Sequence, residues 1–352
     1  MESPKKAHAA DCQSSNLRWA STSNTIYLNG PVSCTLSQIK SSIPKAPLEQ
    51  VDVVNHIWFL GANLKIQSGA ELILHGSDIG GDVDVLRLKS NNSSSSNSVV
   101  NITAQWGTIE VSNSKIVSWD SISNGPDAEY SIYKRAHIKV RSYLEPDGIT
   151  ARESRFDITN SEISYLGYNG SEAYGLSWKV IGSSDGLYDE VNVYGNIIGS
   201  RIHHNYFGTY TFGANDMIIQ NNEIDHNIKY GLDSHDDSDN LLIEENNSHD
   251  NGNHGIICSQ RCDHLTIRGN YSTNNIGNGI MLHRNTNYSI IENNIASGNS
   301  DSGYAIFDSH YNILRNNIAT ANHKGIRFSV GCSGTFIENY DFNSNSYYGV
   351  YS

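Results

Sequence analysis

Three side chains that can transfer protons lie close together in the stretch from Tyr230 to His235. Tyr230 carries a phenol, Asp233 a carboxylate and His235 an imidazole. An imidazole titrates near neutral pH and suits a general base, and a phenol across the substrate can return a proton directly or through water. We therefore expect His235 as the base and Tyr230 as the acid in a reaction that inverts a carbon atom beside a carboxylate.

Such a reaction needs a cation or hydrogen-bond donors on the substrate carboxylate, because the neighbouring C–H group is very weakly acidic while that carboxylate is charged. Arg261 and Lys179 are the candidates, and such a group can contribute roughly 3 kcal/mol of transition-state stabilisation. Asp233 would either orient His235 or, in its protonated form, donate a hydrogen bond to the substrate carboxylate.

The chain from residue 217 onward consists of repeated lines of similar length. Each line has two or three short apolar runs and no helical period, which is typical of one coil of a right-handed parallel β-helix. Two residue types recur at intervals of 22 to 24, and these are Gly231, Gly255, Gly279, Gly303, Gly325 and Gly349, and Asn227, Asn251, Asn275, Asn299, Asn322 and Asn345. We expect a side-chain amide ladder from the asparagines and a bend with positive φ from the glycines.

Aligning the coils on the recurrent glycine predicts which side chains point inward. Positions one and three after the glycine are mostly apolar and should face the interior. Positions two and four should face outward, so Asp233 and His235 are expected to face solvent on one flank. Lys179 occupies the same column as His235 two coils earlier, roughly 10 Å away at the ~4.8 Å spacing of paired strands.

The outward columns and adjacent turns hold further candidates for substrate binding. These are Tyr210, His254, His283, Arg284, Lys324 and Arg327. Tyr210 and its neighbour Phe212 are either platforms on which a sugar stacks or packing residues. The others are either sugar-binding groups or ordinary surface residues.

Composition limits the partners that the chain can have. A net charge of −13 over 352 residues argues against nucleic acid, and an acidic polysaccharide would need the local cations named above. No apolar run approaches 18 residues, so no membrane span is expected. We predict a monomer with an N-terminal segment and cap over 1–50 and a parallel β-helix over 51–352. Thr35 to Ile43 is expected to form a short capped helix over the open end of the solenoid, and Asn91 to Ser98 a low-complexity loop.

Cysteine usage points to an oxidising compartment. Cys12 and Cys34 can link the N-terminal cap, whereas Cys262 and Cys332 lie three coils apart and are too distant to bond. Met1 to Ala10 lacks the apolar core of a signal peptide, so we interpret it as a mature or trimmed N-terminus with an added Met. Together with several Asn-X-Ser/Thr sequons, these features favour a secreted, extracellular or periplasmic protein.

Metal binding is not expected. His203 and His204 are adjacent imidazoles, but the sequence shows no third ligand near them. The stretch from Asp236 to Asp239 is interpreted as a solvated turn rather than a calcium site. We predict that no cofactor is required, with calcium as the alternative.

The stretch Tyr-Gly-Leu-Asp-Ser-His-Asp at 230–236 resembles the YG(F/I/L)DPH(D/E) signature of mannuronan C-5 epimerases, which convert mannuronate to guluronate within alginate. The likeness covers roughly residue 100 to the end and resembles the periplasmic and brown-algal-type branch. Its other segments are Ser118-Trp119-Asp120, Leu166-Gly167-Tyr168, residues 171–175, residues 203–208, His254-Gly255-Ile256-Ile257 and His283-Arg284-Asn285. We count His204 and Asp236 from these segments among the substrate-binding residues.

The sequence departs from the family pattern at two positions, and the second departure favours the periplasmic and brown-algal-type branch. Ser234 replaces the usual Pro of the signature, and Ser259 stands where the secreted, calcium-dependent branch has a second catalytic Asp. The calcium-binding nonapeptide repeats of that branch are absent too. The resemblance implies that an Arg neutralises the substrate carboxylate. Arg261 matches it best, and Gln260 is the alternative because the loop is one residue shorter.

Two other functions remain open from the sequence. A polyuronate lyase would use the same base and neutralising group and would then eliminate the 4-O-linked sugar. A non-catalytic polysaccharide-binding or structural β-helix would need none of this chemistry.

Overall fold

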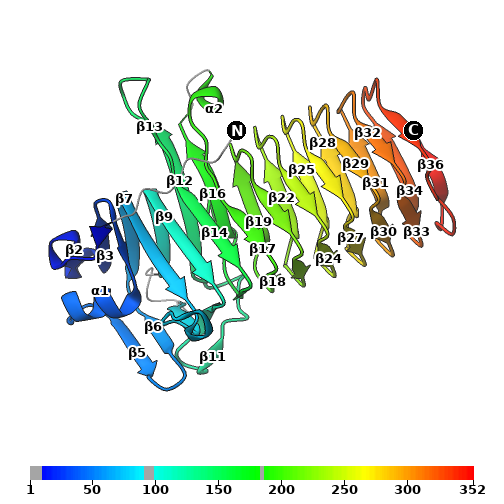
Figure 1. The fold of residues 1–352 in the computed structure, drawn as a ribbon. Helices are drawn as coiled ribbons and strands as arrows, with labels where there is room; N and C mark the ends of the chain where they lie inside the picture. The colour runs from blue at the N-terminus through cyan, green and yellow to red at the C-terminus, as the bar shows by residue number, and fades with distance from the viewer. Residues whose placement is uncertain (1–9, 91–98, 183–185) are drawn as a thin grey trace.

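The computed structural model describes residues 10–90, 99–182 and 186–352. The low-complexity loop predicted at 91–98 and the first nine residues lie outside the described residues. The described chain winds into one elongated solenoid whose coils stack from the N-terminal to the C-terminal end (Figure 1). Successive coils pair through parallel strands, so the predicted parallel β-helix is confirmed.

Each regular coil contributes one strand to each of three series. The first series consists of β12 (His137–Leu144), β16 (Gly175–Ile181), β19 (Phe207–Phe212), β22 (Leu232–His235), β25 (Ile256–Ser259), β28 (Ile280–His283), β31 (Ser302–Phe307), β34 (Lys324–Ser329) and β36 (Tyr348–Tyr351). The second consists of β14 (Arg155–Thr159), β17 (Asn196–Ile198), β20 (Ile218–Gln220), β23 (Leu242–Glu244), β26 (Thr266–Arg268), β29 (Ile290–Glu292), β32 (Ile313–Arg315) and β35 (Phe336–Glu338). The third consists of β15 (Glu162–Ser164), β18 (Arg201–His203), β21 (Glu223–Asp225), β24 (Asn247–His249), β27 (Tyr271–Thr273), β30 (Ile295–Ser297) and β33 (Ile318–Thr320).

The N-terminal coils are less regular. Their strands are β1 (Ala10–Asp11), β2 (Leu17–Ala20), β3 (Thr25–Asn29), β4 (Val32–Cys34), β5 (Leu48–Asp52), β6 (Ile57–Leu60), β7 (Asn63–His75), β8 (Val85–Lys89), β9 (Asn101–Ser112), β10 (Lys115–Asp120), β11 (Gly125–Pro126) and β13 (Ala151–Arg152). The helices are α1 (Leu36–Ser42), α2 (Leu187–Glu190) and the 3₁₀ turns η1 (Ser14–Asn16), η2 (Ser21–Ser23) and η3 (Ser77–Ile79).

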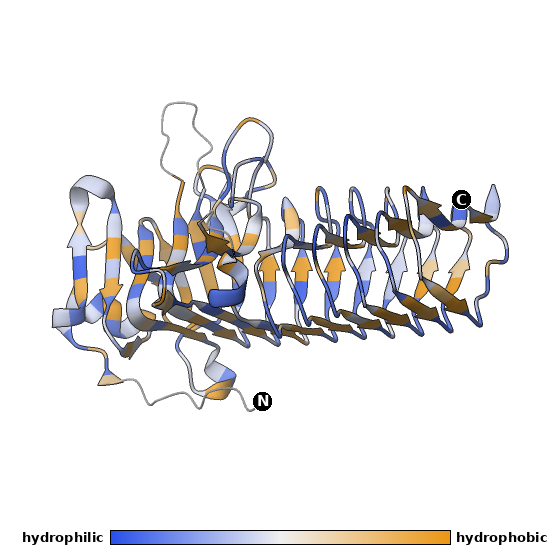
Figure 2. Ribbon diagram, turned by 90° about the horizontal axis from the view of Figure 1, so that it is seen from above, coloured by the Kyte–Doolittle hydropathy of each residue, from blue (hydrophilic) through white to orange (hydrophobic). Residues whose placement is uncertain are grey.

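The interior of the solenoid is a continuous apolar core formed by the inward columns. Leu232, Ile256 and Ile280 pair in register from coil to coil and are at most 1% exposed. Figure 2 shows the apolar strands along the length of the body and the more polar turns between them. The predicted inward columns are therefore confirmed, and they leave alternate side chains of the same strands on the outer surface.

Two buried columns of asparagine side chains run along the turns. In the predicted column, the Asn227 amide donates to the Asn251 side chain at 3.0 Å, and Asn251 donates to Asn275 at 3.0 Å. The chain of bonds continues to Asn345. A second column runs through Asn222, Asn246, Asn270, Asn294 and Asn317. Each amide also satisfies buried backbone groups, so the predicted ladder is confirmed.

Glycine is required in the recurrent column for a different reason from the one expected. Gly231 and the glycines that follow it in its column do not adopt positive φ. A Cβ atom on Gly231 would lie 2.4 Å from Ser248 Oγ and 2.5 Å from the carbonyl oxygen of Gly255. The prediction of a positive-φ bend is wrong, because the column requires close approach of neighbouring coils rather than a special backbone conformation.

The N-terminal end is closed by a helix, a hairpin and a disulfide. α1 begins after Thr35, whose side chain accepts from the backbone of Gln38 in a capping box. β2 and β3 form an antiparallel hairpin, and β3 pairs with β7. Cys12 is bonded to Cys34 across a Cα separation of 5.0 Å, as predicted. No helix in the described part of the chain is long and apolar enough to span a membrane.

β12 and β13 form an antiparallel hairpin, in which Leu144 pairs with Ala151. It projects beyond the row of coils on the same side as α2 (Figure 1). Both projections belong to the coils that precede β19 and β22.

Candidate active site

β22 presents Asp233 and His235 on the outer surface of the first series, with Tyr230 at the turn before the strand. Tyr210 and Phe212 on β19 pair with these two positions on one side, and Ile257 and Ser259 on β25 pair with them on the other. The predicted register is therefore confirmed. The outer surface of the first series is the candidate substrate-binding face.

Asp233 is outward-pointing but buried, with 4% exposure. The expectation that Asp233 faces solvent is therefore wrong. Its ladder neighbours, Tyr210 and Ile257, are bulky and flank it on both sides. Burial, together with the Asp236 charge, outweighs the His235 charge and raises the pKa of Asp233 to about 7. A carboxyl group with this pKa is protonated in a large fraction of molecules near neutral pH and can then donate a hydrogen bond.

His235 contacts Asp236 rather than Asp233. Its Nδ1 atom lies 2.8 Å from Asp236 Oδ2, out of line for a good hydrogen bond, so the contact is a close ion pair. The imidazole stacks on Phe212 at 6.0 Å and lies 5.7 Å from the Tyr210 ring. Burial lowers the pKa of His235, but the contact with Asp236 and the nearby carboxylates outweigh burial and raise it. Asp236 therefore orients the imidazole, which leaves Asp233 free for the hydrogen-bond-donor role.

Tyr230 stands at the other end of β22. Its ring meets Phe207 edge-on at 4.9 Å and lies 5.5 Å from the His254 ring. Burial and the Asp233 charge raise the pKa of Tyr230, so the phenol keeps its proton at neutral pH. Five residue steps separate Tyr230 from His235, which corresponds to at most about 16 Å between Cα atoms. This upper limit is wide enough to admit one sugar ring between the two side chains.

Arg261 and Lys179, the two candidates for neutralising the substrate carboxylate, both form ion pairs with carboxylates of the protein. Arg261 Nη2 lies 2.6 Å from Asp236 Oδ1 and 2.9 Å from Asp237 Oδ2, and the Arg261 side chain is 47% exposed. Through Asp236, Arg261 is one contact away from His235. Gln260 and Arg261 follow β25 with φ of 78° and 55°, and the backbone N–H of Arg261 donates to Arg284 of the next coil. The prediction that Arg261 neutralises the substrate stays a prediction.

Lys179 lies in the His235 column two coils earlier, as predicted, through pairing with Phe212. Its ammonium group is 3.5 Å from Glu172 Oε1 and 4.7 Å from the centre of the Phe212 ring. Glu172 also binds Arg141, the ladder neighbour of Lys179 on β12, at 2.5 Å. Sequence reasoning missed Arg141 and Lys139. Extending the outward columns back into the alternating stretch His137–Leu144 would have found both.

Aromatic rings that the sequence analysis did not select lie just before the site. Tyr174 stacks on Phe207 at 4.5 Å and meets Tyr210 edge-on at 5.0 Å. Burial raises the pKa of Tyr210, with a further contribution from Asp233, so this phenol is also protonated. Tyr210 is only 9% exposed, and packing therefore accounts for most of its surface.

The coils after β22 carry a small apolar cluster in the outward columns of the first series. Ile257, Met281 and Ala305 lie in the Asp233 column and form a small cluster against which Tyr230 and Phe307 pack. These outward positions are thus buried by their own neighbours.

The remaining predicted residues on this side are engaged with the protein. His254 Nδ1 accepts from the backbone N–H of Asn278 at 2.9 Å, and burial lowers the His254 pKa to about 4. His283 Nδ1 lies 3.2 Å from Ser259 Oγ. Lys324 and Arg327 both pair with Asp301, at 3.1 and 3.2 Å. Arg284 is exposed at the turn after β28.

The structure does not bring His204 into this group. His204 lies at the turn between β18 and β19, where it stacks on Tyr165 at 4.9 Å and on His226 at 5.2 Å. Its substrate-binding role stays a prediction.

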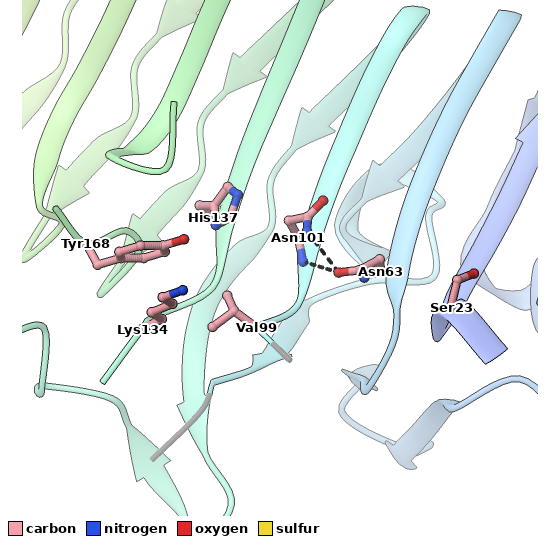
Figure 3. Close-up of a pocket in the computed structure, with 7 residues that line it drawn as sticks. All are labelled: Ser23, Asn63, Val99, Asn101, Lys134, His137 and Tyr168. Atoms are coloured by element: carbon pink, nitrogen blue, oxygen red, sulfur yellow. Dashed lines mark hydrogen bonds between the residues drawn. The ribbon is translucent and has the colours of Figure 1, made fainter. Parts of the chain in front are cut away.

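A cavity of about 540 Å³ lies on the first coils, well before β22. Ser23, Asn63, Val99, Asn101, Lys134, His137 and Tyr168 line it (Figure 3). Asn101 donates to Asn63 at 2.9 Å, and His137 occupies the Gly175–Phe207–Tyr230 column three coils before Tyr230. The cavity therefore lies on the same surface as the site without being part of it.

A family model described as "Right handed beta helix region" matches residues 100–283 and 256–352. The chain belongs to this family. The match gives the hand of the solenoid, and the right-handed form predicted from the repeats is confirmed.

Curated relatives of this right-handed β-helix are mannuronan C5-epimerases. The Pseudomonas aeruginosa enzyme is 29% identical over 209 residues, which is 58% of this chain and 34% of the relative. The Pseudomonas putida enzyme is 27% identical over 214 residues, covering 58% of this chain and 36% of the relative. The alignments thus span about a third of each relative. The predicted resemblance to this family is confirmed.

A solved structure of a periplasmic alginate epimerase, AlgG, superposes with a TM-score of 0.75 at 24% identity, covering 88% of this chain and 68% of that one. A double mutant of AlgG gives the same TM-score at 23% identity, covering 90% and 70%. At this level of identity the superposition shows a shared fold.

Proposed function

We propose that this protein is a polymer-level C5 epimerase that converts β-D-mannuronate to α-L-guluronate in alginate. The observation that carries the proposal is the arrangement on β22, where His235 and Tyr230 stand at opposite ends of one outward surface with Asp233 between them. The sequence relationship to mannuronan C5-epimerases supports the choice of substrate.

The polymer would lie along the solenoid axis, across the first series. Lys139, Arg141 and Lys179 line the coils before β22 in outward columns and supply local positive charge on a chain of net charge −13. Lys324 and Arg327 do the same on later coils, at about 4.8 Å per coil. Local cations of this kind attract a polyanion even when the overall charge repels it.

Epimerisation then requires two proton transfers on opposite faces of one sugar ring. Neutral His235 would accept the C5 proton, and the electron pair would move into the carboxyl group of the substrate as an enediolate. Protonated Asp233 would donate to that group, and Arg261 would supply positive charge beside it. Tyr230 would then deliver a proton to C5 from the other face and be reprotonated from solvent, which returns the site to its starting state after His235 releases its proton.

The competing outcome is elimination. If the C4–O bond broke after the proton left C5, the same groups would make an unsaturated chain end. Incubating the protein with polymannuronate and recording proton NMR spectra and ultraviolet absorbance separates the two reactions. New guluronate signals without absorbance growth support epimerisation, and absorbance growth from unsaturated ends supports a lyase. The absence of both would support a non-catalytic polysaccharide-binding protein.

We propose that the reaction needs no added cofactor. The carboxylates of Asp236 and Asp237 bind the Arg261 guanidinium, and Asp239 accepts from the backbone N–H of Asp263, so this acidic turn is occupied by protein donors. Epimerisation should therefore persist in a calcium chelator. We further propose that the protein works as a monomer in the periplasm or outside the cell, where the Cys12–Cys34 disulfide is stable.

A further inference from the structure

A second group of chemically reactive side chains lies away from β22, at the turns that follow β18 and β21. His203 ends β18, His204 follows it, and Asp225 ends β21 in register with His203. The sequence offered the two histidines without a third ligand. The fold supplies that ligand, because one coil of the solenoid separates Asp225 from His203.

The imidazoles of His203 and His204 each point a ring nitrogen toward the other. His203 Nδ1 and His204 Nδ1 lie 2.7 Å apart, and one ligand atom from each of His203, His204 and Asp225 falls within 4.8 Å of the others. In a tetrahedral site with bonds of about 2.0–2.1 Å, ligand atoms stand about 3.3 Å apart. The two nitrogens therefore need to separate by only a fraction of an ångström to accept an ion between them.

The surrounding groups already hold these ligands in a suitable state. His203 Nε2 lies 3.1 Å from Glu162 Oε1, and Lys115 holds that same carboxylate oxygen at 2.6 Å. A carboxylate on one imidazole nitrogen fixes the tautomer that leaves the other nitrogen bare, as is usual for metal-binding histidines.

Asp225 is fully buried and held in one orientation. Arg201 donates to both of its oxygens at 2.9 Å, and His226 Nδ1 lies 2.7 Å from Oδ2. A carboxylate has about four lone-pair positions, and these contacts use three of them. One lone-pair position of Asp225 is left for a metal ion. The buried negative charge that such an ion would contact is already held in place by Arg201 and His226.

We propose that His203, His204 and Asp225 bind a divalent transition-metal ion of the zinc class. Two imidazoles and one carboxylate suit such an ion, whereas calcium prefers oxygen ligands alone. Three protein ligands leave a fourth position for water. Because His204 leads into β19 and Asp225 leads toward β22, the ion would join the turns before two strands of the candidate active site, and its role is structural rather than catalytic.

A neighbouring group competes for the same ion. Glu223, Asp225 and His249 also place ligand atoms within 4.8 Å of one another. Both nitrogens of His249 face carboxylates, however, with Nδ1 2.7 Å from Asp250 and Nε2 3.4 Å from Glu223. Ion pairing accounts for that arrangement, whereas His203 Nδ1 and His204 Nδ1 face each other in a hydrogen bond that a metal ion would replace.

The test uses the full chain, stripped of metal with a chelator and titrated with Zn²⁺ by calorimetry in the absence of polysaccharide. We expect one tight site per chain and a rise of a few degrees in Tm when Zn²⁺ is in excess. Co²⁺ should give the intense visible absorption of a site of low coordination number.

Three variants locate the ion. His204→Asn keeps a residue that tolerates the φ of 56° at this turn, and His203→Gln keeps a polar side chain of similar length. Both should lose at least tenfold in Zn²⁺ affinity with unchanged circular dichroism. His249→Gln and the remote His310→Gln should bind as the unaltered protein does.

The proposal is overturned if no tight site is found, if His204→Asn and His203→Gln bind Zn²⁺ normally, or if only His249→Gln loses binding. None of these measurements depends on epimerase activity, so the metal site and the proposed function fail or succeed separately.

Discussion

The coil that contains β22 and the next coil, which contains β25, have similarly packed interiors and different outer surfaces. Inside, Leu232 pairs with Ile256, and Asn227 bonds to Asn251. Outside, Asp233 and His235 pair with Ile257 and Ser259. The backbone is equivalent in the two coils, so the difference in chemistry comes entirely from outward side chains.

This contrast separates stability from activity in a way that a globular enzyme seldom permits. Inward residues and asparagine ladders hold each coil to its neighbours, and each coil contacts only those neighbours. Outward residues do not enter that interior, although Ile257, Met281 and Ala305 form a small apolar cluster of their own and Asp233 is buried at a cost. Substitutions on the two surfaces should therefore have effects on different measurements.

The strongest test of the contrast is His235→Ala against Ser259→Ala, the equivalent position one coil later. Loss of a general base typically costs a factor of 10² to 10⁴ in rate, so His235→Ala should lower kcat on polymannuronate by about that amount. Ser259→Ala should change kcat by less than about fivefold. Initial rates from proton NMR measure both. Similar rates for the two variants would remove His235 from the mechanism.

Tyr230→Phe should have the next largest effect, because it removes only the phenol oxygen and keeps the ring that packs on Ile257 and Met281. We expect kcat to fall by about 10²-fold with little change in KM or Tm. Tyr271→Phe, on the exposed surface of the third series, is the matched control. A rise in KM without a fall in kcat would assign Tyr230 to binding.

Asp233→Asn tests the one outward residue that opposes stability. The folded-state pKa of about 7 lies above the ordinary value of 3.8, so folding favours the protonated form. That stabilisation is complete below about pH 4 and is lost as the pH rises toward 7. The variant should be more stable than the parent at pH 8, by on the order of 1–3 kcal/mol, and should lose this advantage at pH 4. Urea unfolding at the two pH values measures the difference. An equal change at both would show that Asp233 is not protonated on folding.

Asn251→Ala tests the shared interior. It breaks two ladder bonds and leaves buried backbone groups without partners, which should cost about 1–3 kcal/mol of unfolding free energy. The exposed Asn343→Ala should cost less than about 0.5 kcal/mol. Both variants should keep kcat within about twofold. A large loss of kcat at unchanged stability would contradict the separation of the two surfaces.

The smallest effect is expected for Asp236→Asn on the pH dependence of the rate. Asp236 contacts His235 and raises its pKa, and a base must be neutral to act. The acidic limb of the kcat profile should therefore move to lower pH, while Asp250→Asn leaves it in place. A shift to higher pH would show that Asp236 does not stabilise the protonated imidazole.

Much of the fold was predictable because a solenoid repeats its sequence. The spacing of Asn227 and its successors predicted the ladder, and alternation around Gly231 predicted inward and outward columns. The function of the glycine column was misjudged, since a pattern of glycines does not distinguish positive φ from close packing. Arg141 was missed because its coil has His137 in place of the glycine on which the coils were aligned, and Tyr174 because it precedes that glycine position.

The amino-acid sequence by itself determined the coil length, the interior and the position of the three proton-transfer groups on one coil. These follow from local periodicity, which needs no knowledge of distant contacts. Only the tertiary structure decided that Asp233 is buried, that Asp236 holds His235, and that Asp225 meets His203 and His204. Each of these features depends on which side chains from neighbouring turns and coils lie 3 to 6 Å away. Burial and charge at that range set the pKa values and the contacts of these site residues.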